Sequence, residues 1–170
     1  MKGFAEQHQF KKRKAINKLT EPSKEQIINQ AFKFHLQGNI SEAVKYYQYC
    51  LNQGFNDPAI FSNYGIILNS LGKKQEAEIL LRKAIKLNPN FADAYSNLGR
   101  ILKDLGKLEE AEILLRKAIE LNPDFANACH NLATILIDQG DLREAEILIK
   151  KAIKLNPMLA DAHSNLGSIF

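Results

Sequence analysis

The sequence of 170 residues lacks the long apolar runs that membrane proteins need. A bilayer-spanning helix requires roughly 20 consecutive apolar residues, and no stretch approaches that length, so we expect a soluble protein. The basic N-terminal residues contain no apolar run either, which argues against a secretory signal. Together these two absences favour a cytoplasmic location.

Cysteine is scarce, with only Cys50 and Cys129 in the whole chain. They fall in different copies of the repeat described below, too far apart for the Cα separation of roughly 6 Å that a disulfide needs. We therefore expect two small buried thiols in a reducing compartment.

Motifs of catalytic chemistry are missing as well. The sequence holds no phosphate-binding glycine loop, no nucleophile elbow and no paired carboxylates in a supporting context. The histidines, His8, His35, His130 and His163, are not spaced as metal ligands, and we interpret them as partly exposed surface or groove residues. We expect no catalytic residue, no metal, no cofactor and no small-molecule substrate.

The net charge is small and unevenly placed. Residues 1–23 hold six basic and two acidic residues, which accounts for the whole formal charge of +4, because the other 17 basic and 17 acidic residues cancel. A neutral body argues against nucleic acid binding along its length. The basic run Lys11–Lys14 lies in what we expect to be a solvated tail; contact with nucleic acid, an anionic membrane or an acidic partner is the alternative.

The sequence does contain a repeat. Residues 58–91, 92–125 and 126–159 share one frame with a period of 34 residues, and residues 24–57 fit it more loosely. Self-similarity at such a period is the signature of a helical repeat array. We expect a basic flexible tail over residues 1–23, four repeats over residues 24–159, and the first helix of an incomplete fifth repeat over residues 160–170.

Each repeat has the pattern of two helices joined by a tight turn. Apolar residues fall at helical spacing in two blocks, separated by Gly38, Gly72, Gly106 or Gly140. The second block ends before Asn-Pro pairs that begin at residues 88, 122 and 156, because proline disfavours helix in the residue before it. Ser23 followed by Gln26 predicts a capping box at the start of the first helix.

Small residues recur where two helices must approach closely. One column on the first helix holds Ala31, Gly65, Gly99, Ala133 and Gly167, and one on the second helix holds Ala43, Ala77, Ala111 and Ala145. A large side chain there would overpack the hairpin. The acidic run Glu109–Glu112 lies at a predicted helix start, where carboxylates favour the positive end of the helix dipole, and we expect it to form a solvated face.

The combination of small residues, turn glycine and terminal proline resembles the tetratricopeptide repeat over residues 24–170. The resemblance implies an all-α fold, a right-handed superhelical solenoid of antiparallel helix–turn–helix repeats whose first helices line a concave groove. Repeats of this family perform no chemistry and bind peptides or partner proteins. The first repeat departs from the pattern at Phe55, where the terminal proline is expected. Residues 94–133 are especially similar to the repeat arm of O-linked N-acetylglucosamine transferases.

An asparagine column runs along the first helices and consists of Asn29, Asn63, Asn97, Asn131 and Asn165. In the matching position of the transferase arm, asparagines line the groove and hold a peptide backbone, so the resemblance implies that role here. A side-chain amide offers a donor and an acceptor to a peptide unit, which suits it. The alternative is that each asparagine bonds the backbone of a neighbouring repeat and sets the geometry of the solenoid.

Other first-helix positions vary between repeats, as specificity positions should. Those that we expect to face the groove are Ser62, Asn69, Asp93, Arg100, Lys103, Asp104, His130, Thr134 and Asp138. Their mixed charge indicates no simple acidic or basic ligand. Some members of the family clamp a C-terminal carboxylate, but here only Arg100 and Lys103 provide cations, and we do not expect such a clamp.

Besides binding of nucleic acid or an anionic membrane through the basic tail, two functions are consistent with the sequence. The first is a non-catalytic scaffold that binds peptide segments or partner proteins in its groove. The second is the substrate-binding arm of an enzyme similar to O-linked N-acetylglucosamine transferases, or of another transferase, whose catalytic domain lies outside these residues. Because Ile169 and Phe170 lack the polar outer face of a terminal cap, the chain is either part of a longer protein or associates with itself through its C-terminal helix.

Overall fold

A computed structural model describes residues 22–169, and all regular secondary structure among these residues is α-helical. The helices are α2 (Lys24–Leu36), α3 (Ile40–Asn52), α4 (Pro58–Ser70), α5 (Lys74–Leu87), α6 (Ala92–Asp104), α7 (Leu108–Leu121), α8 (Ala126–Gln139), α9 (Leu142–Leu155) and α10 (Ala160–Ser168). The prediction of an all-α helical-repeat solenoid is confirmed. Residues 1–21, with the basic run, and Phe170 lie outside the described residues.

The chain divides into two compact units. The unit that ends at residue 53 contains the hairpin of α2 and α3, and the unit that begins at residue 54 contains α4 to α10. In the first unit, Ser23 Oγ accepts a hydrogen bond from the backbone N–H of Gln26 at 3.1 Å. Gln26 Oε1 accepts one from the backbone N–H of Ser23 at 2.8 Å. The predicted capping box is confirmed.

Glycine closes the first helix of each repeat. Gly38, Gly72, Gly106 and Gly140 have φ values of 71°, 79°, 75° and 86°, a left-handed conformation that penalises any residue with a Cβ. A further glycine in this conformation, Gly54 at 71°, follows α3. It supplies the turn in the one repeat that lacks the terminal proline.

The second helices end where the sequence predicts. α5, α7 and α9 stop at residues 87, 121 and 155, each directly before an Asn-Pro pair. In all three pairs the asparagine Oδ1 accepts a hydrogen bond at 3.1 Å from the backbone N–H two residues later. Such an asparagine turn stabilises the break between repeats.

Small residues occupy the contacts between paired helices. Ala77, Ala111 and Ala145 are fully buried, as their column predicts. A Cβ built on Gly99 would lie 2.6 Å from Leu115 Cγ, which is closer than two carbon atoms can approach without a shift. The absence of a side chain at this position therefore sets how closely α6 and α7 can pack.

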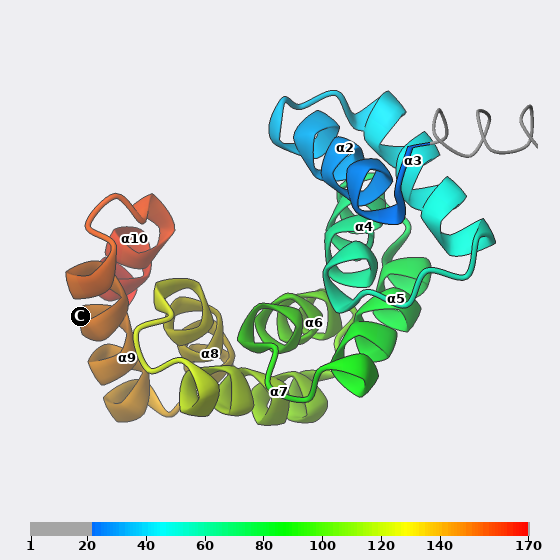
Figure 1. Cartoon of the computed structure of the whole chain (residues 1–170). Helices are drawn as coiled ribbons and strands as arrows, with labels where there is room; N and C mark the ends of the chain where they lie inside the picture. The colour runs from blue at the N-terminus through cyan, green and yellow to red at the C-terminus, as the bar shows by residue number, and fades with distance from the viewer. Residues whose placement is uncertain (1–21, 170) are drawn as a thin grey trace, which may run out of the picture. The chain divides into compact units, whose positions relative to one another are not determined.

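Within the second unit, first and second helices occupy opposite sides. α4, α6 and α8 lie on the inner side of the curve and α5, α7 and α9 on the outer side (Figure 1). Each first helix packs on its own second helix, and α6 also contacts both α4 and α8. α10 packs on α9, as expected for a helix that covers the fourth repeat.

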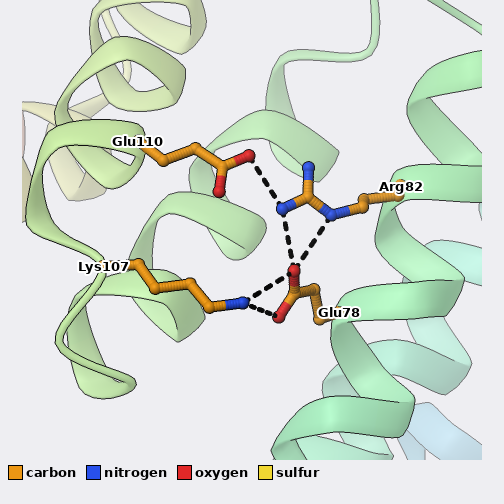
Figure 2. Close-up of polar contacts among 4 residues, drawn as sticks. All are labelled: Glu78, Arg82, Lys107 and Glu110. Atoms are coloured by element: carbon orange, nitrogen blue, oxygen red, sulfur yellow. Dashed lines mark hydrogen bonds and ion pairs between the residues drawn. The ribbon is translucent and has the colours of Figure 1, made fainter.

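Ion pairs link successive second helices on the outer side. Glu78 on α5 lies 2.8 Å from Arg82 and 2.9 Å from Lys107, and Arg82 lies 2.7 Å from Glu110 on α7 (Figure 2). One repeat further on, Arg116 Nη1 lies 2.6 Å from Glu144. We call these two clusters the ionic brackets.

The ionic brackets correct one prediction. The acidic run Glu109–Glu112 is not only a solvated face, because Glu110 pairs with Arg82 and Glu112 lies 2.9 Å from Arg116. The prediction is incomplete for Glu110, whose partner Arg82 belongs to the preceding repeat and could not be seen from one helix alone.

Both cysteines are buried free thiols, as predicted. Burial raises the pKa of Cys129, so this thiol stays protonated at neutral pH.

Candidate functional site

A hollow of about 490 Å³ lies among the first helices of the second unit. α6 contributes Asp93, Ser96, Asn97, Arg100, Lys103 and Asp104, and α8 contributes Asn127, His130 and Asn131. Phe125 and Leu159, which precede α8 and α10, and Asp161 on α10 complete the lining. The lining is mostly polar, so the hollow suits a polar ligand such as a peptide backbone.

Five of the eight predicted site residues meet in this hollow: Asn97, Arg100, Lys103, His130 and Asn131. The other three do not line it. Asn29 is exposed in the first unit, and Asn63 on α4 and Asn165 on α10 are half-buried outside the lining.

The amides of Asn97 and Asn131 are two of the polar groups of the lining. Asn131 is only 8% exposed, and Asn97 is half-buried. Neither side chain forms a hydrogen bond with another described residue, whereas the asparagines before the prolines, such as Asn88, do. For these two asparagines, therefore, no side-chain bond to a neighbouring repeat, the alternative considered from the sequence, is made within residues 22–169.

The two cations of the hollow differ in their surroundings. Lys103 Nζ donates a hydrogen bond to Thr134 Oγ1 at 3.1 Å, and Thr134 Oγ1 donates one to the carbonyl of Asn131 at 2.7 Å. The first of these bonds ties α6 to α8 across the repeat boundary, and the second lies within α8. Arg100 has no ion-pair partner among residues 22–169, so its guanidinium remains available.

His130 is half-buried, and its Nδ1 atom is buried without a hydrogen-bond partner among the described residues. Burial lowers the pKa of His130, the charge of Lys103 acts in the same direction, and Asp161 opposes both. The imidazole is therefore neutral at neutral pH and offers one donor and one acceptor.

The lining also contains three carboxylates, those of Asp93, Asp104 and Asp161, so the hollow is not a simple anion-binding site. Asp104 Oδ2 lies 3.9 Å from Lys74 Nζ, and the carbonyl of Asp104 accepts a hydrogen bond from the same amine at 3.5 Å. Asp93 and Asp161 have no ion pair within the described part of the chain. The mixed charge predicted for the groove is present in the lining.

Sequence reasoning missed part of the site. Phe125, Asn127, Leu159 and Asp161 line the hollow, and Ser96 does so although it is almost fully buried. All except Ser96 lie at helix starts, just after the Asn-Pro pairs, and this regular placement in the repeat was the signal that could have found them. Ser62, expected in the groove, is buried and outside the lining.

Neither a metal site nor a membrane segment is found among residues 22–169. No group of three or more histidine, cysteine, aspartate or glutamate side chains there could hold a metal ion. None of the described helices is long and apolar enough to cross a bilayer.

Family models described as tetratricopeptide repeat match residues 59–91, 92–125 and 113–167. The chain belongs to the tetratricopeptide-repeat family. No significant match is found among curated protein sequences.

Several solved structures share the fold. MamA residues 41-end from Desulfovibrio magneticus RS-1 superimposes with a TM-score of 0.71 at 26% identity, over 84% of this chain and 81% of that one. YrrB, described as a tetratricopeptide-repeat protein with an unusual peptide-binding site, superimposes with a TM-score of 0.69 at 23% identity. The match covers 81% of this chain and 71% of YrrB. The first tetratricopeptide-repeat domain of Spaghetti (RPAP3), bound to an HSP90 peptide, superimposes with a TM-score of 0.64 at 21% identity. The match covers 66% of this chain and 90% of that domain.

None of these three structures is described as a transferase arm. The family is therefore established, and the narrower similarity to O-linked N-acetylglucosamine transferases stays a prediction from the sequence.

Proposed function

We propose that this chain is a non-catalytic scaffold that binds an extended segment of a partner protein in the hollow between α6, α8 and α10. The observation that carries the proposal is the pair of amides of Asn97 and Asn131, which line the hollow and make no hydrogen bond with the described chain. An amide pair one repeat apart can donate to and accept from successive peptide units of an extended chain.

The rest of the lining supports the same role. Arg100, His130 and Asp161 add a cation, a neutral imidazole and an anion to the same lining. Such a set discriminates between peptide side chains without requiring a ligand of one charge. The peptide-binding site described for YrrB and the HSP90 peptide bound to the Spaghetti domain belong to proteins with the same fold, which supports a peptide as the ligand here.

The test begins with selection of binders from a random library of twelve-residue peptides on the native chain. Affinity for a selected, fluorescently labelled peptide is then measured by anisotropy for the native chain and for the double variant Asn97→Ala/Asn131→Ala. We expect the double variant to bind about thirtyfold more weakly, because two amide contacts contribute about 1 kcal/mol each.

The control is Gln75→Ala, which removes an exposed amide from α5 on the outer side of the same unit. It should leave affinity unchanged, and all three proteins should melt within about 2 °C of one another because no internal hydrogen bond is lost. A double variant that binds as tightly as the native chain, or a selection that enriches no peptide, would contradict the proposal.

A further inference from the structure

The outer side of the second unit carries a row of exposed isoleucines. Ile79, Ile113 and Ile147 lie at equivalent positions of α5, α7 and α9, and each is 67% exposed. Single exposed apolar side chains are common, but a row with one in every repeat is a surface feature of the whole unit. We call it the isoleucine row, and it lies on the second helices, away from the hollow.

Charged residues flank the isoleucine row in a pattern that changes sign between neighbouring helices. On α7, Glu109 and Glu120 lie four residues before and seven residues after Ile113, which places all three on one face of the helix. On α9, the equivalent residues around Ile147 are Arg143 and Lys154. All four charged side chains are exposed.

These flanking charges differ from the ionic brackets in being largely free. Glu109, Arg143 and Lys154 form no ion pair within residues 22–169, although Arg116 and Glu144 tie α7 to α9 at 2.6 Å nearby. Glu120 pairs only within its own helix, with Lys117 at 2.7 Å. The flanking charges are therefore available to a partner.

We infer that α7 and α9 form a docking surface for a second copy of this chain. A two-fold axis parallel to the helices and between α7 and α9 sets α7 of one copy over α9 of the other. Ile113 then meets Ile147 of the second copy. Glu109 faces Arg143 and Glu120 faces Lys154, and each contact occurs twice. This inference does not depend on the proposed peptide binding.

The charge pattern selects this arrangement over its neighbours. An axis centred on α7 would set Glu109 and Glu120 against themselves, which is repulsive. An axis between α5 and α7 would bring the neutral Gln75 opposite Glu109 and leave only Lys86 with Glu120. The same arrangement also brings three like-charged pairs together: Glu110 with Glu144, Arg116 with Lys150, and Lys117 with Lys151. Within the described part of each copy, all of these side chains except Lys151 already have an ion-pair partner of opposite charge, which reduces the repulsion.

The size of the surface predicts a weak dimer. Helices of 14 residues are about 21 Å long and pack about 10 Å apart, so two helices cover roughly 400 Å² on each copy. The two copies together would bury roughly 800 Å². Stable complexes bury about 1,200 Å² or more, and smaller interfaces are typical of transient association.

The experiment is sedimentation equilibrium of the full chain from about 10 μM to about 1 mM at low salt. We expect a reversible monomer–dimer equilibrium. Glu109→Arg and Arg143→Glu should each weaken dimerisation about tenfold, because each substitution creates two like-charge contacts, and the double variant Glu109→Arg/Arg143→Glu should restore it. Ile113→Gln should weaken it as well.

Met158→Gln is the matched control, since Met158 is 88% exposed but lies outside the isoleucine row, and dimerisation should be unchanged. A native chain that stays monomeric to 1 mM overturns the inference and leaves the row to a different protein or to an anionic membrane. A dimer whose affinity the double variant does not restore also overturns it, and that result would favour self-association through the C-terminal helix.

Discussion

At the level of single residues, the fold depends on positions where a side chain would clash with a neighbouring helix. Gly99 and Gly167 occupy the same place in the repeat, yet a Cβ on Gly99 would meet Leu115, and one on Gly167 would meet nothing within 4 Å. The difference arises because α6 is covered by its own second helix, whereas no described helix follows α10. Comparing an alanine substitution at each glycine therefore distinguishes the effect of side-chain packing from the effect of helix propensity.

We predict that Gly99→Ala lowers the free energy of unfolding by about 1–3 kcal/mol, since overpacking outweighs the gain in helix propensity. Gly167→Ala should leave it unchanged or raise it by up to about 1 kcal/mol, because only the propensity changes. Chemical denaturation followed by circular dichroism measures both. Equal effects of the two substitutions would contradict the packing account.

Many of the local structural features could be predicted from the sequence. The turn glycines, the buried alanine columns, the Ser23 cap and the Asn-Pro breaks depend on local backbone chemistry and repeat in register, so their positions were correctly predicted. Whether the side-chain amides of Asn97 and Asn131 form hydrogen bonds within the protein could not be predicted. The sequence cannot show whether a neighbouring backbone comes within hydrogen-bonding distance of an amide.

At the scale of helices, the ionic brackets join repeats on the outer side. Glu78 is only 13% exposed and accepts hydrogen bonds from both Lys107 and Arg82. Burial raises the pKa of Glu78, but these hydrogen bonds and the two positive charges outweigh it, so the pKa lies below its usual value. The ionised carboxylate therefore stabilises the folded state above the unfolded pKa of 4.5, and this contribution is lost as the pH falls through the lower folded pKa.

We predict that Glu78→Gln lowers the free energy of unfolding by about 1 kcal/mol at pH 7, with a smaller difference from the native chain below about pH 4. The control is Glu76→Gln on the same helix, whose carboxylate is 57% exposed and pairs only with Lys73, and it should have little effect at either pH. Urea denaturation at the two pH values measures both variants. A Glu78→Gln effect that persists undiminished in acid would contradict the ionic account.

The sequence could not predict the ionic brackets for a reason that belongs to this scale. Glu110 and Arg82 are in different repeats, and only the packing of α5 beside α7 brings them to 2.7 Å. The pattern of one helix correctly predicts that these charges lie on an exposed face, but it does not show that Glu110 pairs with the preceding repeat. The same limitation hid Asp161, which reaches the hollow from α10.

At the scale of the second unit, the molecule presents two surfaces of different character. The inner helices α6, α8 and α10 form a polar hollow with unpaired amides, and the outer helices α7 and α9 carry isoleucines between charges of opposite sign. A scaffold with both surfaces could hold a peptide on one side while it pairs with a second copy on the other.

Peptide binding in the hollow can be located residue by residue with a ¹⁵N NMR titration of the chain with the selected peptide. We expect the side-chain amide signals of Asn97 and Asn131 to shift first, together with backbone signals of α6 and α8, while the signals of α5 and α7 away from the hollow stay in place. Shifts confined to the outer helices, with the two asparagine amides unmoved, would contradict this expectation.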